Sequence, residues 1–118
     1  MKEQFNARML RVHFGEDDRW HDKPLQEAIL AKCEELKVLE AVVFRGMEGY
    51  GSASRIRHAS HWPYSKDAPI QMTIIGTEEQ IGKLTSDLDE LIEEGLVAAS
   101  SVEVIRCSRA PEKVSEKP

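Results

Sequence analysis

The stretch that decides the fold comprises residues 69–95, PIQMTIIGTEEQIGKLTSDLDELIEEG. In its first part, apolar residues alternate with polar ones at Ile70, Met72 and Ile74. This period of two predicts a strand that is buried on one face. In its second part, apolar residues recur every three or four positions, which predicts an amphipathic helix. The buried stripe of that helix is expected to contain Ile81, Leu84, Leu88, Leu91 and Ile92.

Both ends of this predicted helix carry local signals. Thr77 is suited to cap the first turn, and Gln80 three residues later completes the pattern of a capping box. Gly95 is expected to be the C-terminal cap, because glycine readily adopts the left-handed conformation that ends many helices.

A similar strand and helix precede this pair in the sequence. Residues Met9–Phe14 alternate in the same way, and Gly15 is expected to end that strand. The first helix is expected to begin at Pro24, which suits a first turn, and to end near Lys37. Trp20, in the polar connection between them, is expected to pack this connection against the helix.

Two further segments, Val38–Phe44 and Val102–Cys107, are rich in β-branched residues and are predicted strands. The resulting order, βαββαβ, predicts an α+β ferredoxin-like fold with two helices on one face of a four-stranded antiparallel sheet. A long loop, about Arg45–Ala68, is expected between the second and third strands. The other sheet face, with Arg11 and His13, has no helix to cover it, so we expect an oligomer.

The length and composition favour a single domain that needs no metal or disulfide. We expect this domain to span residues 1–107 of the 118, with a flexible polar tail over residues 108–118. The sequence contains no apolar run of membrane-spanning length and no signal peptide, so we expect a cytoplasmic protein without direct membrane insertion. The net charge of −5 argues against a nucleic-acid partner.

The two cysteines, Cys33 and Cys107, form no CxxC pair and are interpreted as free core thiols. No metal site is expected, because clustered ligands of the zinc type are absent. Asp17, Asp18, His21 and Asp22 are better interpreted as a solvated turn before the first helix than as cation ligands.

The most specific local feature is the glycine-rich segment 44–57, FRGMEGYGSASRIR. Glycines let backbone N–H groups approach an anion closely, and arginine can bind two phosphate oxygens at once. The pattern alone fits an anion site and a plain hairpin equally well. The candidate ligand-binding residues are Arg45, Gly46, Gly49, Gly51, Ser52, Arg55 and Arg57, with Arg106 as a weaker candidate.

Three blocks in this order resemble a family of uncharacterised PII-like proteins: G-E-x-D-x-W-x-x-K-P-L at 15–25, F-R-G-x-x-G-Y-G at 44–51 and V-E-V-I-R at 102–106, where x marks positions that carry no part of the resemblance. The resemblance covers about residues 8–106. It implies a ferredoxin-like domain that forms a homotrimer, with the long loop after the second strand. It also implies an adenine nucleotide (AMP, ADP or ATP) bound between subunits, and a membrane channel or transporter as a candidate partner.

We therefore expect a regulatory protein rather than an enzyme, with no required cofactor. Ligand binding near the base of the long loop would order this loop and change the surface that it presents to a partner. Two alternatives remain at this point: a small enzyme that uses His13, His58, His61 or Cys107, and a ligand-free protein-interaction module.

Overall fold

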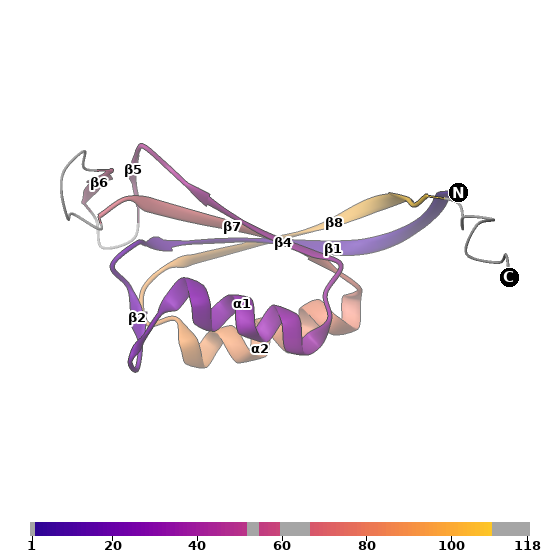
Figure 1. Cartoon of the computed structure of the whole chain (residues 1–118), viewed down its shortest axis with the longest axis horizontal. Helices are drawn as coiled ribbons and strands as arrows, with labels where there is room; N and C mark the ends of the chain where they lie inside the picture. Colours follow the sequence, from indigo (N-terminus) through magenta and orange to yellow (C-terminus); the bar gives the residue numbers. More distant parts are fainter. Residues whose placement is uncertain (1, 52–54, 60–66, 110–118) are drawn as a thin grey trace, which may run out of the picture.

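A computed structural model describes residues 2–51, 55–59 and 67–109. The main sheet is antiparallel, in the order β4-β7-β1-β8, and two helices cover one of its faces (Figure 1). Its elements are β1 (Lys2–Gly15), α1 (Leu25–Leu36), β4 (Glu40–Arg45), β7 (Pro69–Gly76), α2 (Glu78–Leu91) and β8 (Leu96–Cys107). The predicted α+β ferredoxin-like fold is confirmed.

Four shorter strands lie in the connections. The strands β2 (Arg19–Trp20) and β3 (Lys23–Pro24) pair between β1 and α1, and Trp20 packs against the core as predicted. Within the long loop, β5 (Glu48–Tyr50) and β6 (Ile56–His58) pair as an antiparallel hairpin. This β5–β6 hairpin lies at one end of the molecule, and the start of β1 and the end of β8 lie at the other (Figure 1).

The core lies between the helices and one face of the sheet. Its strand residues follow the predicted alternation, because Leu10 pairs with Ile74 and Val12 pairs with Met72 on the same face. All four of these side chains are fully buried. The helices contribute the stripe that the sequence predicted, of which Ile81, Leu84, Leu88 and Leu91 are buried and Ile92 is partly buried.

The capping box of α2 is confirmed, whereas the prediction for its C-terminal end is wrong. Thr77 Oγ1 accepts a hydrogen bond from the Gln80 backbone N–H (3.1 Å), and Gln80 Oε1 accepts one from the Thr77 N–H (2.9 Å). The helix ends at Leu91, with Ile92 as its C-cap. Gly95 instead lies just before β8, where a Cβ atom would approach the His13 carbonyl oxygen to 2.7 Å.

The neighbouring antiparallel strands β1 and β8, of which β8 is an edge strand, are much longer than predicted. They pair without interruption from Lys2 opposite Cys107 to His13 opposite Leu96. Their outer part extends beyond the helices as a two-stranded ribbon (Figure 1). We call this ribbon, Lys2–Ala7 paired with Val102–Cys107, the terminal arm. Residues 110–118 of the predicted tail lie outside the described residues.

The two cysteines differ in environment. Cys33 is buried in α1, as predicted, but Cys107 is exposed at the tip of the terminal arm. The interpretation of both as core thiols is therefore wrong for Cys107, because the ribbon that carries it has no helix over it. Among the described residues, no helix is long and apolar enough to cross a membrane.

The sheet face opposite the helices is open. Arg11 is exposed on it and His13 is half-buried, as expected from their place in β1. Apolar side chains are also exposed on this face, because Phe44 and Leu96 share a row with His13 in the register of the sheet. Phe44 is 52% exposed and Leu96 is 63% exposed.

Candidate functional site

A cavity of about 480 Å³ lies at the base of the long loop, where the β5–β6 hairpin meets the ends of β1, β4 and β7. We call it the loop-base cavity. It is lined by His13, Phe14, Phe44, Gly46, Glu48, Gly49, Tyr50, Gly51, Pro69, Ile70 and Gln71. The predicted glycines Gly46, Gly49 and Gly51 therefore all line one cavity.

The glycines let the hairpin lie close to the start of β7. A Cβ atom at Gly46 would meet the Pro69 ring at 3.0 Å, and one at Gly49 would meet it at 3.4 Å. The Gly46 N–H already donates a 2.7 Å hydrogen bond to the Pro69 carbonyl oxygen. A Cβ at Gly51 would meet nothing within 4 Å. The candidate Ser52 lies outside the described residues.

Sequence reasoning missed the aromatic and amide side chains of this cavity. Phe44 and Tyr50 expose 52% and 74% of their surface, and His13 comes from the neighbouring end of β1. The Gln71 side chain donates to Thr73 Oγ1 at 3.2 Å, which fixes one end of its amide. The alternation in β4 was the available signal, because it places Phe44 on the face without helices.

The predicted arginines do not line the loop-base cavity. Arg45 follows Phe44 in β4 and therefore lies on the other face of the strand. It binds the Glu16 carboxylate through two hydrogen bonds of 2.7 and 3.0 Å. Arg55 binds Asp67 in the same bidentate way, at 2.7 and 3.0 Å. Such forked pairs are among the strongest hydrogen bonds between side chains.

Arg57 is the centre of a group of charges at the loop end. Its side chain is only 7% exposed, and its Nη1 lies 2.9 Å from Asp17 Oδ1 and 3.4 Å from Asp67 Oδ1. Its Nη2 lies 3.8 Å from Asp18 Oδ1. The guanidinium lies over Gly15, where a Cβ atom would approach Nη1 to 1.9 Å. Asp17 and Asp18 are thus ion-pair partners, rather than members of a merely solvated turn.

We call Glu16, Asp17, Asp18 and Asp67 the carboxylate cluster. It brings four carboxylates to the three arginines of the long loop. Hydrogen bonds from Arg55 lower the pKa of Asp67, so this carboxyl stays ionised. Burial raises the pKa of Asp18, although a hydrogen bond from the Gly15 N–H and the charge of Arg57 oppose that shift. The four carboxylates thus outnumber the three arginines by one within one chain.

The last arginine candidate lies far from the others. Arg106 is opposite Glu3 in the terminal arm, forms a 3.5 Å ion pair with it, and lies 5.9 Å from the centre of the Phe5 ring. About 12 residues of strand separate Glu3 from Gly15, which corresponds to roughly 40 Å. Within one chain, Arg106 and the loop-base cavity therefore do not meet.

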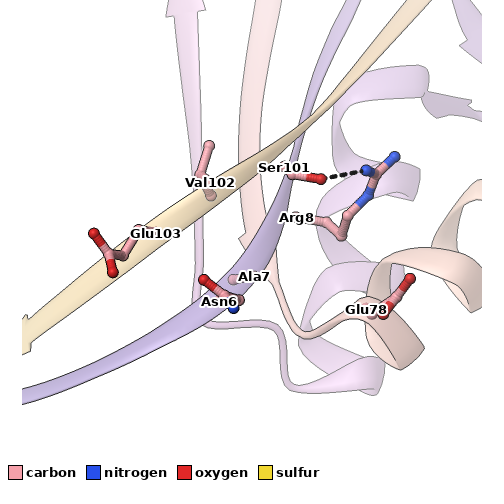
Figure 2. Close-up of a pocket in the computed structure, with 7 residues that line it drawn as sticks. All are labelled: Asn6, Ala7, Arg8, Glu78, Ser101, Val102 and Glu103. Atoms are coloured by element: carbon pink, nitrogen blue, oxygen red, sulfur yellow. Dashed lines mark hydrogen bonds between the residues drawn. The ribbon is translucent and has the colours of Figure 1, made fainter.

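A second cavity, of about 470 Å³, lies where the terminal arm leaves the core (Figure 2). Figure 2 shows Arg8 near its rim, donating a 2.9 Å hydrogen bond to Ser101 Oγ. Glu78 and Glu103 are the other charged residues that line it. Two carboxylates and one engaged arginine make this cavity a poor site for an anion.

Within one chain, the described residues of the enzyme alternative lie apart. Cys107 is at the tip of the terminal arm, opposite Lys2, whereas His13 lines the loop-base cavity. His58 is exposed on β6, and His61 lies outside the described residues. Across residues 2–51, 55–59 and 67–109, no group of three or more His, Cys, Asp or Glu is arranged to hold a metal ion.

Solved structures with the same fold include CPII from Thiomonas intermedia K12, a nitrogen regulatory PII-like protein. Its structure bound to ADP, AMP and bicarbonate has a TM-score of 0.66 and 17% identity, with 86% of this chain and 91% of that chain covered. Its apo form has a TM-score of 0.61 and 15% identity, with 91% and 100% covered. At these identities the likeness establishes the PII-like fold.

Sequence comparison identifies the family. A UPF0166 protein from Aquifex aeolicus (strain VF5) is 30% identical over 98 residues, which cover 83% of this chain and 92% of the relative. The family model of DUF190, described as "Uncharacterized ACR, COG1993", matches residues 7–104. The expected resemblance to uncharacterised PII-like proteins is therefore confirmed, and this chain belongs to the DUF190 family.

Proposed function

We propose that this protein is a PII-like regulatory protein, not an enzyme, that binds an adenine nucleotide or another phosphate-bearing ligand at the loop-base cavity. The supporting observation is this cavity itself, in which glycines, aromatic rings and an amide meet under the long loop. CPII, which has the same fold, is bound to ADP and AMP in its own structure.

The chemistry of the loop-base cavity suits a flat heteroaromatic ring. Its volume of about 480 Å³ lies within the usual range for small-molecule sites. Phe44 and Tyr50 offer exposed rings for stacking, and the Gln71 amide carries both a donor and an acceptor for the edge of a base. The phosphates would lie toward Arg45, Arg55 and Arg57 on the other side of the hairpin base.

We further propose that the protein works as a homotrimer in the cytoplasm. The open sheet face, with Phe44 and Leu96 exposed, is the surface that supports association. The site would then lie between subunits, and Arg106 of a neighbouring subunit would reach a cavity that it cannot reach in its own chain. The hairpin would signal to a protein partner, for which a membrane channel or transporter is our candidate.

Isothermal titration calorimetry with AMP, ADP, ATP and adenosine tests this function, with the mass in solution measured alongside. We expect saturable binding near one ligand per subunit. Phe44→Ala should weaken it roughly 5- to 150-fold, because stacking of a base on an aromatic ring contributes about 1–3 kcal/mol. Ile56→Ala is the matched control, because Ile56 is 60% exposed on the same hairpin but does not line the cavity.

A ligand-free interaction module is the second candidate function. It is favoured by the apolar side chains that the hairpin exposes, because Met47 is 83% exposed and Ile56 is 60% exposed. If a well-folded trimer gives no heat with any of the four compounds, the nucleotide function is refuted and this module becomes the better explanation.

A further inference from the structure

Arg57 is buried without full hydrogen bonding. The residue is 6% exposed, and its Nε has no hydrogen-bond partner among the described residues. Its Nη1 is shared between Asp17 at 2.9 Å and Asp67 at 3.4 Å. An unpartnered buried donor is costly, so an acceptor that satisfied Nε as well would bind this guanidinium better than the present carboxylates.

Asp67 connects two arginines of the hairpin with the start of β7. It receives both hydrogen bonds of Arg55 and also contacts Arg57. Asp17, in the turn after β1, contacts Arg57 from the other side. The hairpin strand β6 is therefore fastened to the body of the domain by charge contacts with two segments.

Apolar packing contributes little to holding the hairpin. Its strands have three residues each, and Met47 and Ile56 expose most of their surface. A short two-stranded hairpin is at best marginally stable by itself. The contacts of Arg55 and Arg57 with the carboxylate cluster are thus well placed to decide whether β6 stays docked.

We infer that Asp67 and Asp17 compete within the chain against a phosphate group for Arg55 and Arg57, so that phosphate binding detaches β6 from the carboxylate cluster while β5 keeps its place at the loop-base cavity. This inference rests on the proposed function and names the regulation of its site. A phosphate presents three oxygens to the guanidinium groups, whereas each carboxylate presents two. Because two arginines already meet Asp17, Asp18 and Asp67, an added phosphate must displace a carboxylate to avoid excess negative charge.

Binding measurements on Asp67→Asn test the competition. We expect ADP and pyrophosphate to bind the variant about 10-fold more tightly than wild type, within the usual range of coupling between sites. The affinity for adenosine, which has no phosphate, should not change. Asp89→Asn is the matched control, since it removes the same charge from an exposed position on α2. Asp17→Asn should act in the same direction as Asp67→Asn.

Hydrogen exchange tests the release of β6. Without any ligand, the amides of residues 55–59 should exchange faster in Asp67→Asn than in wild type or Asp89→Asn. In wild type, saturating pyrophosphate should accelerate the same amides, and adenosine should not.

The outcomes separate the two proposals. If ADP binds wild type and its affinity is the same in Asp67→Asn, the competition is overturned while the nucleotide function stands. If pyrophosphate binds wild type as tightly as ADP does, and its affinity increases by the same factor in Asp67→Asn, the competition is supported. The ligand would then be a simple phosphate compound rather than a nucleotide. If neither compound binds either protein, the phosphate-binding function is overturned, and the competition fails with it.

Discussion

Gly15→Ala should destabilise the protein only when Arg57 is present. Gly15 does not have a positive φ, so its backbone tolerates alanine, which by itself should add about 0.4–1 kcal/mol of stability. The new Cβ atom, however, would lie 1.9 Å from Arg57 Nη1 and 2.2 Å from Cζ. The buried guanidinium must therefore move away from Asp17 and Asp67.

The magnitude follows from the burial of these groups. Breaking a buried ion pair costs about 3–5 kcal/mol. Asp17 and Asp67 are 52% and 26% exposed, so water compensates part of the loss, and a cost of roughly 2–3 kcal/mol is more realistic. In an Arg57→Ala background this cost should disappear. The coupling free energy between the two substitutions should then be roughly 2–3 kcal/mol.

Urea unfolding of the four proteins at one fixed subunit concentration measures this coupling, because association would otherwise shift the apparent stability. Tryptophan fluorescence is a suitable signal, since Trp20 packs against the core close to the turn that contains Gly15. If the free energy of unfolding falls with urea concentration at the same slope in all four proteins, unfolding exposes a similar amount of surface in each of them. A Gly15→Ala cost that is the same with and without Arg57 would refute the reasoning.

Three further predictions concern α2, the two thiols and the carboxylate cluster. Thr77→Ala should lower the free energy of unfolding by about 1 kcal/mol, because α2 loses its N-terminal cap. Ser86→Ala on the same helix should change the free energy of unfolding little. Equal effects of the two substitutions would contradict the capping role of Thr77. Burial raises the pKa of Cys33 to about 11, whereas Cys107 is exposed. A thiol reagent at about pH 8 should therefore modify Cys107 alone until the protein is unfolded. Rapid modification of both thiols in the folded protein would contradict the buried environment of Cys33. Because hydrogen bonds from Arg55 lower the folded-state pKa of Asp67, its contribution to stability is present above its ordinary value of 3.8 and is lost as the pH falls below it. Urea unfolding at decreasing pH should therefore show a smaller loss of stability in Asp67→Asn than in wild type, and parallel curves would exclude this contribution.

The parts of the fold that face the core were predictable from the sequence. Met72 in β7 and Leu84 in α2 belong to patterns of period two and of helical period, and both are fully buried. In the terminal arm, Val102–Cys107 was a predicted strand, but its partner Lys2–Ala7 was not. Gln4 donates a hydrogen bond to Glu103 across a ribbon that no helix covers, so no buried face marks Lys2–Ala7 as a strand. The prediction of Gly95 as a helix cap was wrong because glycine is favoured both at helix ends and where another strand approaches closely, as His13 does here.

The glycines of the candidate site were predictable from the sequence, but the residues that contact its arginines and the other side chains that line the cavity were not. Gly46 and Gly49 stand in a distinctive motif, and both line the loop-base cavity. The pairing of Arg57 with Asp17 joins residues 40 positions apart, and composition or local spacing carries no information about such a contact. Gln71 was likewise identified only as a polar strand residue, because its place in the cavity depends on how four elements meet.

The terminal arm offers a practical point of attachment. Its tip, where Lys2 lies opposite Cys107, is at the far end of the molecule from the β5–β6 hairpin (Figure 1). About 13 residues of strand, or roughly 40 Å, separate Lys2 from Gly15. A dye coupled to the exposed Cys107 thiol would therefore sit well away from the loop-base cavity of its own chain, but in the proposed trimer it would adjoin the cavity that Arg106 reaches in a neighbouring subunit. Such a dye would therefore report on subunit association, because its surroundings would change when the terminal arm reaches a neighbouring subunit.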